Sequence, residues 1–503
     1  MAETLSDPPV RSSPVTGTVL PLGRPFWIVD GRAYDFTDWM RLHPGGATWF
    51  GPSQGRDISA LVHTYHREPA RLQRFLAQYE IEGFTEQDIL PKLGVPPFLL
   101  DPEFDATTDL PRLDYRDEGS LLAQIRSTVN ARFSKRDLRK YDRAFDAVTW
   151  VIVAVHLAAL ALLIASLLPA WAFVLVMVVT RTSLAGAGHY QLHRKWTDQQ
   201  RYKIPIGKAL FDVNYVGTSL IGADGHVLLH HPYMGSGADV KKTFFDGMLR
   251  LHPVLRIPGY TLHKLGICLT GLSMRAMELA RFEKPKDKGK APLRVDFWLI
   301  RGLLVVEFAA CLATGHIVAW LVQFVLTLWF NTFLVVASHD FEQSETEAEI
   351  AAIPEALRDD WAARQICLSY DLSVVGNRWI DLFLSAGLSP HRVHHVLPYQ
   401  RSGFTNLVSE EAVREVCAEA GIVWERPRNL IFNRFPAVMK HYLLCPVKPL
   451  PPRLPPPPPP RNTFPVQPPP PPPKPAEQPP SSVWRQVAEL FRYTFDGLRG
   501  FGV

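Results

Sequence analysis

The sequence predicts three parts in chain order: a small α+β domain, an all-α domain with four membrane-crossing helices, and a disordered proline-rich C-terminal tail. A compact stretch of mixed composition occupies residues 23–85, between a Ser/Pro/Thr-rich start and a polar segment with scattered prolines. Two long apolar blocks follow, and each is long enough to cross a bilayer twice. Two runs of six prolines mark the tail.

The bulk composition excludes several classes of protein. The 503 residues are 47% apolar and 20% charged, and the formal net charge is +5. Because this charge is small and no dense basic patch is present, no nucleic-acid partner is expected. The five cysteines never form a CxxC pair, which argues against a disulfide framework or a zinc site and indicates reduced thiols. No basic segment followed by an apolar core opens the chain, so no cleavable signal peptide is expected.

Changes in composition along the chain predict where its segments begin and end. The start is expected to be disordered because it is rich in Ser, Pro and Thr, and the last segment to be a short amphipathic helix that lies on a surface. The small domain is expected to begin with a strand near Phe26–Val29. The expected segments are a disordered start (1–22), the small domain (23–85), a linker (86–115), the membrane domain (116–445), a proline-rich linker (446–480) and the amphipathic helix (481–503).

Each apolar block is expected to form a helical hairpin. From Ala147 to Thr180 there is no Asp, Glu, Lys or Arg, and Pro169 stands where a turn would lie. The second block runs from about Phe297 to Ser338, and Gly315 divides it. About 20 apolar residues suffice for one crossing. The expected crossings are about 147–167, 170–187, 296–314 and 317–338.

Charged residues predict the orientation in the membrane. Arg301 and Glu307 lie within the third expected crossing, where they are expected to reach an interface or to form an ion pair. The two short turns lack Lys and Arg, whereas basic residues flank the opposite ends, as in 135–140 and 194–203. Positive charge collects on the cytosolic side, so both termini are expected in the cytosol.

A haem site is indicated in the small domain. Residues 43–46 read His-Pro-Gly-Gly, and Gly55-Arg56-Asp57 follows. A Pro-Gly-Gly turn lets the backbone approach a flat macrocycle and aims the histidine at iron. This stretch resembles the cytochrome b5 haem-binding domain. The resemblance implies haem b held by His43 and a second histidine, for which we favour His66 over its neighbour His63. Two histidine ligands leave no position for oxygen, so such a domain carries electrons.

Nine further histidines form three clusters and a singleton on the predicted cytosolic side. The HxxxH spacing of His189 and His193 puts both rings on one face of a helix. Imidazole suits iron, and an apolar setting favours the neutral form that binds metal. Since one pair alone would be weak evidence, the prediction of a two-ion centre depends on the clusters occurring together. The expected ligands are His189, His193, His226, His230, His231, His339, His391, His394 and His395.

The region from about 145 to 435 resembles the membrane fatty acid desaturase and hydroxylase superfamily. The resemblance rests on the paired crossings and on the boxes HxxxH, HxxxHH and HxxHH, and it is greatest with the branch of cytochrome b5-related proteins around 390–407. It implies two non-haem iron ions, with His339 as a further ligand. The second box is one residue longer than the common HxxHH, and this departure from the family pattern concerns His226. His391 stands where front-end desaturases usually carry Gln, which argues against that subclass.

The resemblance implies a fatty acid or lipid desaturase of the endoplasmic reticulum membrane. Such an enzyme would use O2, a lipid or acyl-CoA substrate, and electrons from NADH-cytochrome b5 reductase delivered through the haem domain, which the linker would allow to move. Two alternatives stay open: a lipid hydroxylase on the same scaffold, and a non-catalytic, membrane-anchored cytochrome b5 electron carrier. The segment 446–480 is expected to be a spacer, with a ligand for proline-reading domains as its alternative.

Overall fold

The structure is a computed structural model of the chain, and the described residues cover most of the two expected domains. The expected disordered start (1–22), linker (86–115) and amphipathic helix (481–503), most of the proline-rich segment, Pro44–Gly46 and the Arg301 side chain lie outside them. The described residues are 25–43, 50, 58–66, 68–82, 119–194, 203–216, 226, 230–235, 239, 246–249, 251–270 and 295–447.

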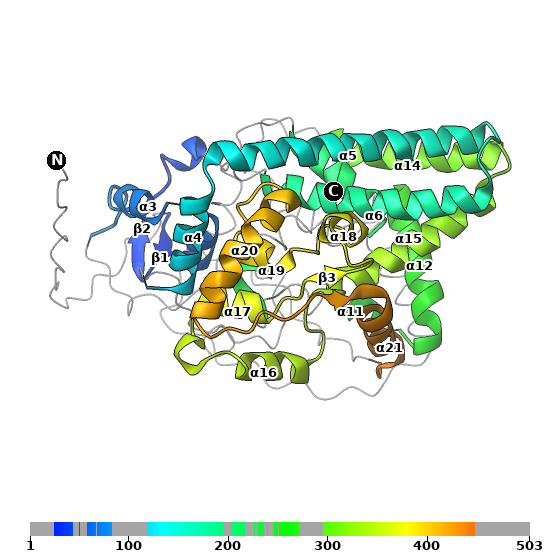
Figure 1. Ribbon diagram of the computed structural model, residues 1–503. Helices are drawn as coiled ribbons and strands as arrows, with labels where there is room; N and C mark the ends of the chain where they lie inside the picture. Colours follow the sequence, from blue (N-terminus) through cyan, green and yellow to red (C-terminus); the bar gives the residue numbers. More distant parts are fainter. Residues whose placement is uncertain are drawn as a thin grey trace, which may run out of the picture.

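The N-terminal domain, blue in Figure 1, is built on a two-stranded hairpin. Strands β1 (Trp27–Val29) and β2 (Arg32–Tyr34) pair antiparallel. Asp30 and Gly31 connect them, and both have positive φ angles, as a two-residue type I′ turn requires. Three short helical elements complete the described part of this domain: η1 (Met40–Leu42), α2 (Ser59–Tyr65) and α3 (Pro69–Leu76).

Aromatic packing holds this small domain together. Trp27 and Phe36 are buried at its centre together with Phe50. The rings of Trp27 and Phe50 meet edge to face with centroids 5.6 Å apart, and the Trp27 indole N–H donates to the Phe50 carbonyl over 3.0 Å. Large rings of this kind bury much apolar area in few residues, which a domain of this size needs.

Three helices are long and apolar enough to cross a membrane: α5 (Lys135–Ile164), α6 (Ala170–Arg194) and α15 (Ile317–Ala337). A further helix, α14 (Val295–Ala313), packs against α5 and α15. Of its described side chains, Gly302–Ala313 form a shorter apolar helix, so three of the four expected crossings meet the length and composition of a span within the described residues. Figure 1 shows the long helices running together away from the N-terminal domain.

Apolar side chains cover the outside of this helix bundle. Trp150 on α5, Trp171 and Leu175 on α6, Val306 on α14 and Val318 on α15 are each more than half exposed. A broad exposed apolar surface is unusual on a protein surrounded by water and is typical of a face in contact with lipid. The bundle is therefore the membrane part of the protein.

An ion pair lies inside the bundle, where charges are costly. Arg181 on α6 pairs with Glu307 on α14, and both side chains are buried. Glu307 also accepts a hydrogen bond from the Trp320 indole N–H over 2.8 Å. Arg181 donates to the Val213 carbonyl over 3.0 Å and lies 4.6 Å from the centre of the Tyr215 ring. Glu307 thus forms an ion pair, one of the two arrangements that its position predicts.

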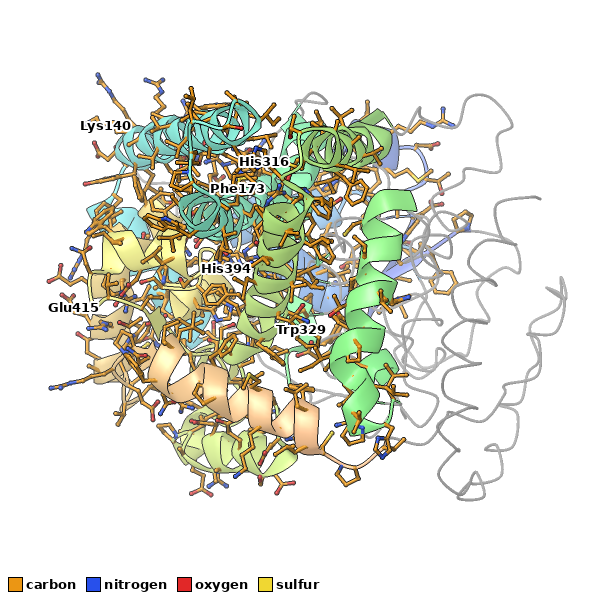
Figure 2. All side chains as sticks on the ribbon, turned by 90° about the vertical axis from the view of Figure 1, so that its right-hand side faces the viewer. Lys140, Phe173, His316, Trp329, His394 and Glu415 are labelled. Carbon is orange, nitrogen blue, oxygen red and sulfur yellow. The ribbon has the colours of Figure 1, made fainter. Side chains whose placement is uncertain are left out.

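Shorter elements form the rest of the second domain. Figure 1 shows α17, α19 and α20 between the N-terminal domain and the long helices. In Figure 2, Lys140 on α5 and Glu415 on α20 lie at the outer edge of the molecule, whereas Phe173 and His394 lie in the packed interior. These elements are α4 (Leu121–Arg132), α7 (Lys203–Asp212), α9 (His231–Tyr233), α11 (Asp246–Leu249), α12 (Pro253–Thr270), α16 (Gln343–Ala351), η5 (Glu355–Leu357), α17 (Trp361–Cys367), β3 (Leu372–Ser373), α18 (Arg378–Leu384), α19 (His391–Val396), α20 (Gly403–Glu419), β4 (Arg428–Asn429), the π-helical turn η6 (Leu430–Arg434) and α21 (Phe435–Leu444).

We expect the single substitutions Arg181→Met and Glu307→Leu each to destabilise the protein by about 3–5 kcal/mol, because each leaves a buried charge without its partner. The double variant should recover most of this loss, since it removes both charges. Thermal unfolding in detergent can be followed with a thiol-reactive dye, because Cys268, Cys311 and Cys417 are buried.

Arg143→Met, at an exposed position of α5, serves as the control and should unfold like the wild type. A double variant that is as unstable as the single variants would contradict this account of the ion pair.

Candidate metal centre

Separate parts of the chain bring nine histidines together near the ends of α6 and α15. The nine positions are the ones that the sequence analysis singles out. Helix α6 carries His189 and His193, the segment entering α9 carries His226, His230 and His231, His339 follows α15, and α19 carries His391, His394 and His395.

Close backbone packing positions the histidines of α6. A Cβ atom at Gly186 would come within 2.4 Å of the Ala386 carbonyl carbon, and one at Gly188 within 2.3 Å of the Phe211 amide nitrogen. Only residues without a side chain allow such an approach. The two glycines therefore seat α6 against α7 and against the turn before α19, which brings His189 toward the other clusters.

The start of α19 is held from outside the cluster. The Arg392 amide donates to Asp371 over 3.0 Å, and the Arg392 guanidinium Nε donates to the Ser369 carbonyl over 2.9 Å. A carboxylate at a helix N-terminus satisfies a backbone N–H and complements the helix dipole. Because these contacts hold the Arg392 side chain away from the cluster, the histidines of α19 face into the cluster.

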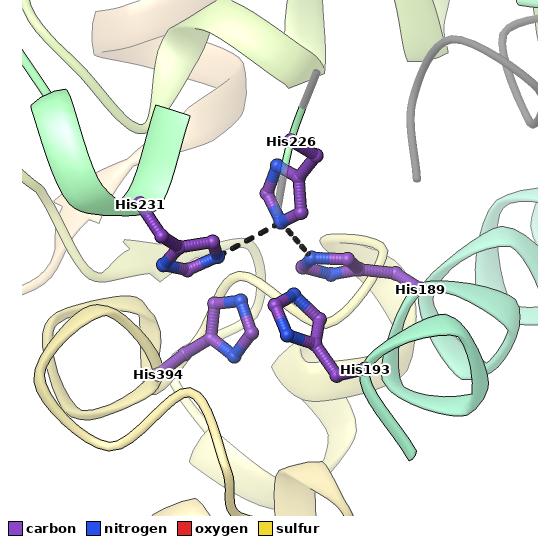
Figure 3. A group of neighbouring side chains, drawn as sticks. All are labelled: His189, His193, His226, His231 and His394. Atoms are coloured by element: carbon purple, nitrogen blue, oxygen red, sulfur yellow. Dashed lines mark hydrogen bonds between the residues drawn. The ribbon is translucent and has the colours of Figure 1, made fainter. Parts of the chain in front are cut away.

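Five of the histidines form the first group, which Figure 3 shows. Their ligand atoms lie within 4.8 Å of one another. The Nε2 atom of His226 lies 2.6 Å from that of His189 and 2.9 Å from that of His231. Nitrogens bound to one ion at about 2 Å from it lie about 3 Å apart. The five residues are His189, His193, His226, His231 and His394.

A second group lies directly beside the first and comprises His230, His339 and His395. Its ring centroids are 4.6–4.9 Å apart. His391 adjoins this group, since its Nε2 lies 3.1 Å from the Nε2 of His395. The two groups touch where the rings of His231 and His395 are 4.5 Å apart. All nine expected positions are thus brought together, in two adjacent groups.

The outer nitrogens of the second group have fixed partners. The Nδ1 atom of His230 lies 2.9 Å from Asp239, that of His395 2.9 Å from Gln365, and that of His339 3.1 Å from the Leu368 carbonyl. Each partner is an acceptor, so each Nδ1 is the protonated nitrogen. The lone pair is then on Nε2, which is the usual arrangement in a metal-binding histidine.

A different observation indicates that the first group can bind a metal. Within the described residues, neither ring nitrogen of His193 or His394 has a hydrogen-bond partner, although both rings are buried. A buried polar atom without a partner is rare in a stable protein. Burial and the neighbouring histidines lower the pKa of His394 well below its ordinary value, which keeps it neutral. Neutral imidazoles with unused lone pairs are suitable metal ligands.

The N-terminal domain holds two histidines in a geometry that suits haem. The ring centroids of His43 and His66 are 6.0 Å apart. Two imidazoles on opposite sides of one iron, with bonds of about 2 Å, have centroids about 6 Å apart. The Nδ1 of His66 donates to the Val62 carbonyl over 2.7 Å, and burial lowers the pKa of His66 to about 4. The neutral ring therefore has its lone pair on Nε2, where iron would bind.

His63, the alternative ligand, has another contact. Its Nε2 lies 2.9 Å from a carboxylate oxygen of Asp30, in the hairpin turn. That nitrogen is the one that an axial ligand would present to iron. His63 thus holds α2 to the hairpin, and His66 stays the predicted second haem ligand.

Fold and site together define a class of membrane protein in which a haem-type domain is fused to a helix bundle with clustered histidines. The sequence model described as fatty acid desaturase matches residues 165–427, and the one described as cytochrome b5-like haem/steroid binding domain matches residues 22–82. The chain belongs to the fatty acid desaturase family and carries a cytochrome b5-like domain at its N-terminus.

Among similar proteins, an acyl-lipid omega-13 desaturase of Chlamydomonas reinhardtii is 23% identical over 82% of this chain and 92% of its own length. A delta(5) fatty acid desaturase A of Dictyostelium discoideum is 39% identical over 13% of this chain and 14% of its own length. A cytochrome b5-related protein of Drosophila melanogaster is 22% identical over 44% of this chain. The chain thus spans 14% of the Dictyostelium relative and 43% of the Drosophila one. No solved structure matches the chain.

The sequence analysis misses the residues that orient the histidines. Gln365 accepts from His395 and also donates from Nε2 to the His231 carbonyl over 2.8 Å, so it connects the two groups. Asp239 lies in a loop nine residues after His230 and also accepts from the Gly235 amide. No sequence motif marks Gln365 or Asp239, because each is identified only by its contact with a histidine in the folded structure.

We expect Gln365→Leu to weaken iron binding by about 10–100-fold, the usual cost of losing a partner of a metal-binding histidine. Gln365→Glu should be less affected, because it keeps the acceptor for His395. Iron bound to the purified protein, titrated against a chelator, measures the change. Gln323→Leu is the matched control, because Gln323 is also buried but donates to Tyr215. Equal iron affinity in Gln365→Leu and the control would contradict the assignment.

We expect His66→Ala to abolish the low-spin haem absorbance of the N-terminal domain, because one axial ligand is lost. His63→Ala should keep that spectrum, since His63 contacts Asp30 instead. Absorbance spectra of the oxidised and reduced proteins measure both. If His63→Ala loses the spectrum and His66→Ala keeps it, the second ligand is His63.

Proposed function

We propose that this protein is a membrane desaturase of fatty acyl chains, with two irons held by the nine histidines and electrons supplied by its own haem domain. The observation that carries the proposal is the meeting of nine histidines, eight of them buried and His226 half-buried, in two adjoining groups with His391 beside the second, at one end of an apolar helix bundle. Ordinary surface histidines are solvated and are not packed with their nitrogens facing one another. The family membership and the C. reinhardtii acyl-lipid desaturase support the same function.

The chain's own residues have distinct roles in this proposal. The first group would hold one iron and the second group, with His391, the other. Gln365 and Asp239 would keep the ligating tautomers, and Gln365 would hold the groups in register because it contacts both. Bound iron would supply the activation of O2 that removes hydrogen from an unactivated CH2. The apolar surroundings of the bundle would keep water from the site and suit an acyl chain.

The setting of the reaction follows from the same proposal. The helices α5, α6, α14 and α15 would provide four crossings, with both termini on the cytosolic side of the endoplasmic reticulum membrane. NADH-cytochrome b5 reductase would reduce haem b held by His43 and His66. The acyl substrate would be carried by a membrane lipid or by coenzyme A.

We expect yeast cells that express the wild type to contain a lipid with an additional double bond, and His394→Ala to lower that product by more than about 100-fold, because a ligand is lost. Mass spectrometry of the extracted fatty acids measures both. His252→Ala, at an exposed histidine outside both groups, is the control and should match the wild type.

The other outcomes of this experiment identify the alternatives. Hydroxylated lipid without new unsaturation would replace the desaturase proposal by a hydroxylase on the same scaffold. Identical lipid profiles for wild type and His394→Ala, with haem but no non-haem iron in the purified protein, would indicate a membrane-anchored electron carrier.

A further inference from the structure

The haem-type domain contacts the metal centre through α2. This helix packs against α9, which begins at His231 of the first histidine group. Its last residue is Tyr65, and the next residue in the chain is the haem-ligand candidate His66. The Tyr65 ring lies 6.5 Å from that of His193, centroid to centroid, with the planes 32° apart. Tyr65 therefore lies between a candidate haem ligand and a candidate ligand of the iron centre.

A buried arginine holds the end of α2 in this position. Arg126 on α4 donates from Nη2 to the His63 carbonyl over 2.7 Å and to the Thr64 carbonyl over 3.4 Å. The last carbonyls of a helix lack partners within the helix and carry partial negative charge, so a cation suits them. Arg126 is buried, and its guanidinium also lies 5.5 Å from the ring of Tyr399, which follows α19. Arg126 therefore connects the end of α2 to α4 and to the segment that follows α19.

The rim of the contact carries an ion pair. Lys135 Nζ at the start of α5 lies 3.0 Å from a carboxylate oxygen of Glu68, which lies between α2 and α3. The exposed fraction is 65% for the Lys135 side chain and 49% for the Glu68 side chain. A buried centre with a charged, solvated rim is the usual design of a specific interface. The contact between the two domains therefore has the features of a specific interface.

We propose that the haem domain is docked in this fixed orientation during turnover and that Tyr65 provides the electron route from His66 to His193. This inference rests on the proposed function, since it needs haem and iron at the two sites. One electron leaves the haem iron, which changes from ferrous to ferric, and reduces one non-haem iron from ferric to ferrous. No proton moves and no bond breaks. Tyr65 is joined to His66 by a peptide bond, and its ring lies 6.5 Å from that of His193, centroid to centroid. Electron tunnelling is faster through bonded and closely packed atoms than through a wider, solvated gap.

The test uses the full-length protein in phosphatidylcholine nanodiscs, with haem and iron loaded. Haem is reduced chemically, the excess reductant is removed, and the iron-dependent part of haem re-oxidation is followed by absorbance after mixing with oxygenated buffer. We expect Tyr65→Leu to slow this step by about tenfold or more, because the aligned ring is lost, and Tyr65→Phe to stay within about twofold of the wild type. Tyr141→Leu, on α5 and without a described ring contact to a histidine, is the control.

Two further readouts separate an electron route from a merely structural role. The haem midpoint potential and the iron content should be the same in Tyr65→Leu and the wild type, because Tyr65 is not proposed as a ligand. Hydrogen exchange of the α2 amides should also be unchanged, whereas Arg126→Leu should increase it by releasing the end of the helix.

The Lys135–Glu68 ion pair allows the docked orientation to be locked. A carbodiimide condenses the amine and the carboxylate into an amide and leaves as a urea, and mass spectrometry of the linked peptides identifies the product. We expect the cross-linked wild type to re-oxidise its haem at the unmodified rate. A large loss of rate on cross-linking would overturn the fixed dock, because it would mean that the domain must move. If Tyr65→Leu is slow but recovers when cross-linked, Tyr65 only docks the domain, and the route is overturned.

Failure of the inference and failure of the proposed function give different results. Fast, iron-dependent re-oxidation in the wild type and an equal rate in Tyr65→Leu would overturn the route and leave the proposed function standing. Re-oxidation that does not depend on iron in the wild type would overturn both.

Discussion

Imidazole nitrogens that face one another inside a protein set strict conditions on everything around them. At separations of 2.6–3.1 Å, such as those of His189 with His226 and His391 with His395, two charged rings would repel strongly. Each ring must therefore be neutral, with its lone pair directed inward. The acceptors at the outer nitrogens, the carboxylate–amide contact at the start of α19 and the glycine contacts of α6 all meet these conditions. Much of the domain's local architecture can be understood as support for this one cluster.

The surroundings of the helix bundle also restrict where charged side chains can lie. Outside the bundle, apolar side chains on α5, α6, α14 and α15 face lipid, whereas the buried Arg181 and Glu307 satisfy each other between α6 and α14. Their partners include an indole N–H, a backbone carbonyl and an aromatic ring, so few of their polar atoms are unsatisfied. This network joins α14 to the helices that carry the histidines. It also shows that a charged residue in an apolar segment can be a packing contact of the membrane domain.

Local patterns in the sequence predict much of this molecule, and contacts between distant residues account for what they miss. HxxxH places His189 and His193 on one helix face, and His-Pro-Gly-Gly marks His43 as a candidate haem ligand, because each motif depends on neighbours in the chain. The partner of His395 is Gln365, 30 residues away, and no pattern in the sequence marks it. The contact of His63 with Asp30 in the hairpin turn likewise has no signal in the sequence. Hydropathy likewise predicts four crossings, of which α5, α6 and α15 meet the length and composition of a span among the described residues.

The Arg126 contact has a consequence for how such a fusion can change over evolutionary time. Its guanidinium contacts two backbone carbonyls, which every residue possesses, so the side chains at the end of α2 are under little selection from this bond. What the contact does specify is that a helix ends at this point and presents its carbonyls in this direction. Relatives whose haem domains share little sequence could therefore keep the same arrangement, provided that the helix keeps its length. Insertions or deletions within α2 would be tolerated far less readily than substitutions on its surface.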